Sequence, residues 1–190
     1  MKNTLIFLIL LFLSWSHPGA IELDTELDSN TAFYEGEFFN YVIPAPDKFK
    51  MATVEAQKDG YSFAFIPRAD NYENADIMIG VHIYKIRGMS FADALTGDTG
   101  SVRAYFGADL QLYPVDSIFS ATGDRLTSFY LNQKKAFIPN VMLSYYDGRS
   151  ELIIFELVIS EKVIRVTAEE IFVKCIGSFK SLRKGELGAR

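Results

Sequence analysis

Few residues of this chain have the types and spacing that catalysis or metal binding requires. The sequence holds two histidines, His17 and His82, and one cysteine, Cys175. A histidine that acts as a general base needs a nucleophile and an orienting group, and a zinc site needs three or four ligands. His82 has no histidine or cysteine near it, so we expect it to be hydrogen-bonded on a sheet face. Cys175 lies among apolar residues at helical spacing, which predicts an inert, buried thiol.

Two short motifs match known sites by spacing alone. Ser181-Leu182-Arg183-Lys184 fits the Ser-x-x-Lys pattern of penicillin-recognising enzymes. It falls at the expected end of the last helix and lacks the companion motifs, so we interpret it as a chance match. Gly97-Asp98-Thr99-Gly100 has neither the lysine nor the spacing of a phosphate-binding loop, and it predicts a break in a helix.

One loop gathers side chains that carry oxygen ligands. Calcium could use them, but the loop lacks the glycine and the terminal glutamate of an EF-hand. We therefore expect a solvated turn, with weak calcium binding as the alternative. Apart from that loop, the sequence predicts no catalytic, cofactor-binding or metal-binding residues, and no cofactor. The loop residues are Asp70, Asn71, Glu73, Asn74 and Asp76.

The N-terminus has the pattern of a secretory signal peptide. Lys2 provides a positive start, the run Leu5–Leu13 is wholly apolar, and a more polar stretch ends at Ala20. The apolar run is about half of the ~20 residues that span a bilayer as a helix. We expect residues 1–20 to be cleaved and the protein to be exported to a periplasm or out of the cell, without stable membrane insertion afterwards. A retained membrane anchor is the alternative.

The composition is that of a globular protein. Of its 190 residues, 49% are hydrophobic and 23% charged, and the formal net charge is −5. The chain is too apolar for a disordered protein and too poor in cysteine for a disulfide scaffold. The negative charge argues against binding to nucleic acid. We expect an acidic, loosely ordered arm over 21–36, for which an edge strand is the alternative, a single domain over 37–184 and a flexible tail over 185–190.

Alternating apolar residues predict a chain that is mostly β. Nearly every residue of Leu152–Ile159 is apolar, which indicates a central strand covered on both faces. It forms a hairpin with the preceding strand across Asp147-Gly148, and Pro114 confines its own segment to a sheet edge. The expected strands are 37–44, 61–67, 77–86, short strands within 111–131 around a turn at 122–124, 141–146 and 151–160.

Two helical regions are expected. Ser90 can cap a helix with Asp93 as its partner, but Gly97 and Gly100 interrupt that helix and a second short helix follows. One long C-terminal helix follows from the spacing of apolar residues. The fold class is therefore α+β, an antiparallel sheet flanked by helices in an α/β/α sandwich. The residues of the C-terminal stripe are Ile164, Ala168, Ile171, Cys175, Phe179 and Leu182.

These landmarks resemble the PsbP-like superfamily, which includes the extrinsic photosystem II protein, a Ran-binding import factor and many secreted bacterial proteins. The similarity covers about residues 36–182. The resemblance implies a fold and action through partners, and it brings no shared catalytic residues. Phe49 stands where many relatives have tryptophan. The segments that carry the resemblance are Phe39–Pro44, Tyr61–Pro67, Ile77–Ile86, Ser90–Leu95, Glu156–Ser160 and the helix through Ala168 and Phe172 to Lys180.

We therefore expect a secreted or periplasmic, non-enzymatic domain that binds another protein. One alternative is a small-ligand-binding protein with an aromatic pocket between the sheet and the terminal helix. A carboxylate-based hydrolase is a further alternative, because paired acids leave no local motif. Four aromatic residues distributed over both sheet faces could leave one patch open: Phe38, Tyr84, Tyr145 and Tyr146. The C-terminus is basic and we interpret it as a solvated helix end, with contact to the acidic N-terminal arm or to anionic lipid as the alternatives. Its basic residues are Lys180, Arg183, Lys184 and Arg190.

Overall fold

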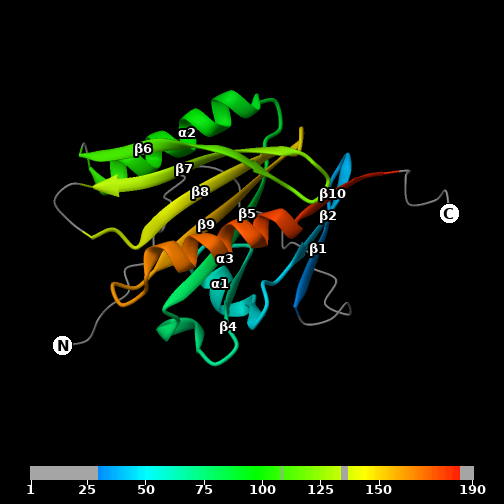
Figure 1. The fold of residues 1–190 in the computed structure, drawn as a ribbon. Helices are drawn as coiled ribbons and strands as arrows, with labels where there is room; N and C mark the ends of the chain where they lie inside the picture. The colour runs from blue at the N-terminus through cyan, green and yellow to red at the C-terminus, as the bar shows by residue number, and fades with distance from the viewer. Residues whose placement is uncertain (1–29, 108, 134–136, 185–190) are drawn as a thin grey trace.

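The computed structural model describes residues 30–107, 109–133 and 137–184, which form two antiparallel sheets and three helices (Figure 1). The larger sheet has the strand order β3-β4-β5-β9-β8-β7-β6, and the smaller one the order β1-β2-β10. The strands are β1 (Thr31–Glu35), β2 (Phe39–Pro44), β3 (Phe49–Ala52), β4 (Phe63–Pro67), β5 (Ile77–Lys85), β6 (Leu110–Phe119), β7 (Arg125–Gln133), β8 (Asn140–Asp147), β9 (Glu151–Ile159) and β10 (Lys180–Arg183). The helices are α1 (Val54–Lys58), α2 (Phe91–Phe106) and α3 (Arg165–Ser178). This arrangement confirms the α+β class.

β9 is the central strand, as its apolar run predicts. All nine of its residues are buried, and it pairs with β5 on one side and β8 on the other. Alternate residues face opposite sides of the sheet, so Phe155 and Leu157 join one core while Leu152 and Ile154 join another. The hairpin with β8 across Asp147-Gly148 is also confirmed.

The two longer helices cover opposite faces of the larger sheet (Figure 1). Phe172 of α3 packs in the core that contains Phe155, whereas Val102 of α2 packs in the core that contains Ile154. The smaller sheet lies on the α3 side, where its residue Tyr41 joins the same core as Phe172. This second sheet was not expected from the sequence. None of the described helices has both the length and the hydrophobicity of a membrane-spanning helix.

The C-terminal helix ends earlier than its apolar stripe predicts. α3 stops at Ser178, and Phe179 has extended backbone angles. The following residues form β10, which pairs antiparallel with β2. Gly177 and Ser178 are weak helix formers, and the pairing with β2 gives the next backbone groups a ladder of hydrogen bonds. Spacing of apolar residues alone could not distinguish these two outcomes, because Phe179 is buried in either.

α2 is continuous, which corrects the expected break at Gly97 and Gly100. It runs for 16 residues, and Ser90 caps it by accepting a hydrogen bond from the Asp93 amide, as predicted. A glycine inside a helix costs only about 1 kcal/mol relative to alanine, which packing of the helix on the sheet can offset. The contact between Val102 and the sheet is part of that packing.

The arm predicted for 21–36 is wrong at its end, because Thr31–Glu35 forms strand β1. Ala32 and Tyr34 alternate with more exposed residues and are buried against the core, whereas the acidic residues concentrate earlier in the arm. Lys184 forms an ion pair with Glu35 at 2.8 Å, so the basic C-terminal region does contact this segment. The segments 1–20, 21–29 and 185–190 lie outside the described residues.

Candidate functional site

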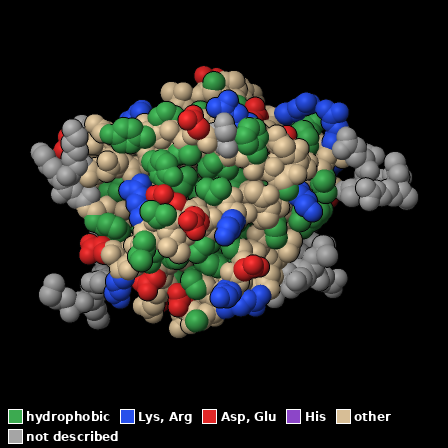
Figure 2. Space-filling model, viewed as in Figure 1, with side chains coloured by type: hydrophobic (Ala, Val, Ile, Leu, Met, Phe, Trp, Pro, Cys, Tyr) green, Lys and Arg blue, Asp and Glu red, His purple; other side chains and the backbone are tan. Residues whose placement is uncertain are grey.

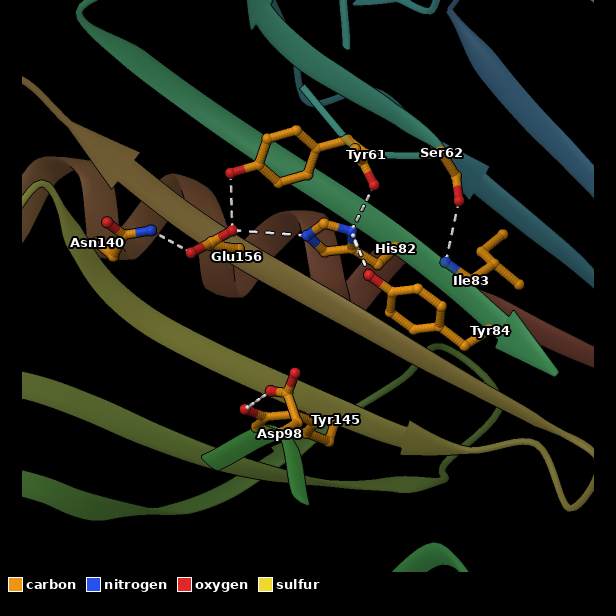
Figure 3. Close-up of polar contacts among 10 residues, drawn as sticks. Tyr61, Ser62, His82, Ile83, Tyr84, Asp98, Asn140, Tyr145 and Glu156 are labelled. Carbon is orange, nitrogen blue, oxygen red and sulfur yellow. Dashed lines mark hydrogen bonds and ion pairs between the residues drawn. The ribbon is translucent and has the colours of Figure 1, made fainter. Parts of the chain in front are cut away.

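A cluster of buried polar side chains lies at the centre of the larger sheet (Figure 3). His82 on β5 and Glu156 on β9 come from neighbouring strands and face each other. Tyr61 reaches them from the turn before β4, and Asn140 from the start of β8. We call these four residues the Glu156 network.

Glu156 is the acceptor of the network. Its Oε2 accepts a hydrogen bond of 2.8 Å from the Tyr61 hydroxyl, and its Oε1 accepts one from Asn140 Nδ2. The side chain is buried, and a buried carboxylate is costly unless both oxygens are bonded, so the two donors stabilise it. Burial, and then the charge of Glu156, raise the pKa of Tyr61 well above its ordinary value, which keeps its hydroxyl a donor.

His82 is held by hydrogen bonds at one ring nitrogen and by ring packing. Its Nδ1 lies 3.1 Å from the Gly60 carbonyl oxygen and 3.0 Å from the Tyr84 hydroxyl. Because a carbonyl can only accept, the contact with Gly60 places a proton on Nδ1. Nε2 lies 3.7 Å from Glu156 Oε2 and forms no hydrogen bond with the described residues. The ring also packs on Tyr61, with centroids 4.4 Å apart. His82 is thus a hydrogen-bonded histidine on a sheet face, as the sequence predicts.

A second buried acid comes from α2. Asp98 Oδ2 accepts a hydrogen bond of 2.6 Å from the Tyr145 hydroxyl on β8, while its Oδ1 is buried without a hydrogen bond to any described residue. Burial raises the pKa of Asp98, and the Tyr145 hydrogen bond and His82 oppose that shift only in part. Burial, followed by the charge of Asp98, raises the pKa of Tyr145 well above its ordinary value.

The groups of this region are those of acid–base catalysis, but they are closed off from solvent. A general acid or base must lie within hydrogen-bond reach of its substrate. His82, Glu156 and Asp98 are each at most 3% exposed. An open depression of about 360 Å³ lies elsewhere, between β6 and β7, where it is lined by residues such as Val115 and Phe129. The Glu156 network therefore connects neighbouring strands of the larger sheet by hydrogen bonds, and a substrate has no access to it in this conformation.

The sequence singles out His82 but does not predict the residues that surround it. Glu156 is the single charged residue inside the apolar run of β9, and that exception was the available signal. Tyr61 and Asn140 carried no signal in the sequence, because their role depends on the pairing of β5, β9 and β8. Gly80 provides the space for the Tyr61 ring, since a Cβ at that position would lie 2.2 Å from Tyr61 Cε1.

The Ser-x-x-Lys motif does not form a catalytic pair. It lies on β10 and just after it rather than at a helix end, which corrects the expected position. Ser181 is buried and donates a hydrogen bond of 2.5 Å to Asp124 Oδ2, whereas Lys184 is exposed and paired with Glu35. The serine instead attaches β10 to the turn between β6 and β7.

The loop with oxygen ligands forms a short 3₁₀ turn over Tyr72–Asn74. Asp76 Oδ1 accepts a hydrogen bond of 2.7 Å from Ser160 Oγ, so this carboxylate fastens the loop to the end of β9. Within 30–107, 109–133 and 137–184, no three histidine, cysteine or acidic side chains lie together as metal ligands would. Cys175 is buried, and burial raises its pKa to about 12, in keeping with an unreactive thiol.

Exposed apolar side chains lie along one flank of α3. Val166 and Val173 are 63% and 41% exposed and lie two helical turns apart. They occupy the flank of α3 that carries Glu169, which accepts a hydrogen bond from the Tyr130 hydroxyl on β7. Tyr130 pairs across the strands with the exposed Tyr113 on β6. We call the four residues Val166, Val173, Tyr113 and Tyr130 the α3–β6 patch.

The side chains of the α3–β6 patch are apolar or aromatic, and the charged residues Arg165, Glu169 and Glu170 lie beside them on α3. Arg165 lies 5.6 Å over the Tyr130 ring and pairs with Glu169 at 2.7 Å, so the two adjacent charges compensate each other. Figure 2 shows hydrophobic side chains gathered on this face of the molecule, over the strands next to α3. Of the four aromatic residues suggested from the sequence, Phe38 is exposed, Tyr84 is half-buried, and Tyr145 and Tyr146 are buried.

No family model matches the chain, and no curated protein matches it. Among solved structures, the chain is similar to the solution structure of cyanobacterial PsbP (CyanoP) from Synechocystis. The two are 15% identical, with a TM-score of 0.48, over 88% of this chain and 96% of that chain.

Proposed function

We propose that this chain is an exported, non-enzymatic domain that binds another protein through the α3–β6 patch. The observation that carries the proposal is the exposure of Val166 and Val173 on a helix whose other apolar residues are buried or half-buried. Exposed apolar groups that lie together beside tyrosines and an arginine are typical of protein interfaces. The buried Glu156 network supports a structural rather than catalytic use of the acid–base groups.

The aromatic-pocket alternative has less support at the place where the sequence suggested it. Between the sheet and α3, the rings of Tyr41, Tyr146, Phe155 and Phe179 contact one another and occupy the space. A carboxylate-based hydrolase needs two acids facing a cleft. Glu156 and Asp98, two acids whose charges act on each other, are both buried and face no cleft between the described residues.

Site-specific photo-crosslinking tests the binding proposal. A photoreactive side chain at position 166 or 173 of the full chain, expressed in its native cell, is expected to capture one discrete partner. The exposed position Lys58 on α1 serves as the matched control and is expected to capture none. Val166→Glu with Val173→Glu should reduce recovery of the partner at least tenfold with no change in Tm. Equal capture from all three positions, or none from a folded protein, contradicts the proposal.

The export component has its own test in the intact mass of the protein recovered outside the cytoplasm. We expect a mass that lacks residues 1–20, because the short apolar run and Ala20 suit signal peptidase. Leu8→Arg interrupts the apolar run and is expected to leave the uncleaved chain in the cytoplasm. A full-length mass for the exported wild-type protein would contradict cleavage and favour a retained anchor.

A further inference from the structure

Helix α2 buries few apolar residues completely, and its other core-facing apolar side chains, Phe91, Leu95 and Phe106, are only partly buried. Its buried residues are Ala94, Asp98, Thr99 and Val102, of which only two are apolar. Thr99 uses its hydroxyl on the backbone of its own helix, at Leu95 O. The 14-residue α3, in contrast, buries Phe172, Cys175 and Ile176 besides an alanine. Since apolar burial supplies most of the stabilisation of a packed helix, α2 is held less firmly than α3.

A glycine lies near each end of α2, and the backbone dihedral angles of glycine can change with little steric cost. Gly88 has φ +72° two residues before the cap, and Gly107 has φ +94° directly after the helix. Glycine adopts this left-handed region without steric cost and changes out of it easily. Two further glycines inside the helix, Gly97 and Gly100, reduce its intrinsic stability. The helix therefore has the construction of a hinged segment.

Asp98 is the main polar attachment of this segment, and it faces ionisable groups from three strands. Tyr145 on β8 donates to it, His82 and Tyr84 on β5 interact with it electrostatically, and Glu156 on β9 opposes its charge. The charged residues of α2 itself, Asp93 and Arg103, are exposed. Asp98 is 1% exposed, and one carboxyl oxygen has no hydrogen bond to the described residues. An ionised carboxylate held in this way is costly to keep buried.

We propose that α2 is a hinged lid, closed over the sheet while Asp98 is protonated and released as Asp98 ionises. Opening transfers the carboxyl to water, where the charged form is no longer penalised. It also uncovers an apolar face that includes Leu143, Tyr145 and Ile154, which pack in the core beneath the helix. This device is independent of the α3–β6 patch, which lies on α3, β6 and β7.

The sign of the pH dependence follows from linkage. The pKa of Asp98 is raised by burial when the lid is closed and returns to its ordinary value when the lid is open. Between these two pKa values the closed state binds more protons than the open state. The closed state is therefore fully stabilised below the ordinary value, and it loses stability as the pH rises towards the raised one. The opening constant should increase by up to roughly tenfold per pH unit in that window.

Hydrogen exchange followed by mass spectrometry tests the lid on the full chain. The opening constant of peptides within 91–106, corrected for intrinsic exchange, is expected to rise with pH in the wild-type protein, while β9 peptides stay protected. Asp98→Asn should remove the slope because the amide does not ionise. Asp93→Asn, on the exposed first turn of the same helix, is the matched control and should keep it.

A second variant keeps the proposal testable if Asp98→Asn fails to fold. Tyr145→Phe removes the hydroxyl that donates to Asp98, so ionised Asp98 becomes harder to hold and opening at neutral pH should rise about tenfold. A flat profile in the wild-type protein overturns the lid. A slope that persists in Asp98→Asn also overturns it, because the titration then belongs to another group. Unchanged opening in Tyr145→Phe has the same effect.

Discussion

Replacing Glu156 by alanine is expected to lower the free energy of unfolding by about 2–6 kcal/mol, because it leaves two buried hydrogen-bond donors without an acceptor. The substitution removes the acceptor for the Tyr61 hydroxyl and for Asn140 Nδ2. Both donors are then buried without a partner, and each such group costs about 1–3 kcal/mol. It also removes the acid beside His82 Nε2. Urea unfolding followed by circular dichroism measures the loss.

Two further variants separate the network from the simple loss of side-chain volume. Glu156→Gln keeps the volume, but its amide nitrogen must face one of the two donors, so a loss of about 1–3 kcal/mol is expected. Glu170→Ala, at an exposed position on α3, should stay within about 0.5 kcal/mol of the wild-type protein. A loss below about 1 kcal/mol in Glu156→Ala would show that the network is not a principal support of the sheet.

The alternation of apolar and polar residues in the sequence was sufficient to predict most strands of the larger sheet. β5, β8 and β9 were predicted because their burial follows from local alternation or from a continuous apolar run. The edge position of β6 was predicted from Pro114, which cannot donate a backbone hydrogen bond. Local sequence was sufficient in these places because each strand's own residues specify how it is covered.

The elements that were missed depend on distant partners. β10 exists because Lys180–Arg183 pairs with β2, which lies about 140 residues earlier in the chain. β1 likewise depends on its pairing with β2. α2 continues through two glycines because the sheet beneath it supplies packing and the Tyr145 hydroxyl. Propensity and periodicity describe neither contribution.

The candidate site was only partly predicted for the same reason, because its side chains come from distant parts of the chain. His82 could be singled out from the sequence as a chemically unusual residue, but the chemical role of a histidine depends on the side chains around it. Glu156 was visible only as an exception in an apolar strand, and its donors come from β8 and from the turn at Gly60. The α3–β6 patch could not be predicted from the sequence either, because it combines one flank of a helix with two strands that are distant from that helix in the chain.

Phe179→Ala is expected to lower the free energy of unfolding by about 3–5 kcal/mol, the range for truncating a buried phenylalanine. Phe179 is fully buried and lies between the end of α3 and the start of β10. Its ring lies 5.0 Å from that of Tyr146, 5.4 Å from Phe155 and 6.1 Å from Tyr41, measured between centroids. Phe119→Ala is the matched control, because that ring is half exposed on an edge strand.

The position of Phe179 predicts a local effect besides the global loss. Tyr41 belongs to the smaller sheet and Tyr146 and Phe155 to the larger one, so the Phe179 ring joins the two sheets. Without it, the smaller sheet loses its central aromatic contact and keeps the hydrogen bond of 3.1 Å from the Tyr41 hydroxyl to Glu151 Oε2, the Tyr41–Tyr146 ring contact and the Ser181–Asp124 hydrogen bond. Hydrogen exchange should therefore increase in β2 and β10 well before it does in β9. An equal increase in all three strands would mean that the two sheets unfold as one unit and that Phe179 supports them only by filling volume.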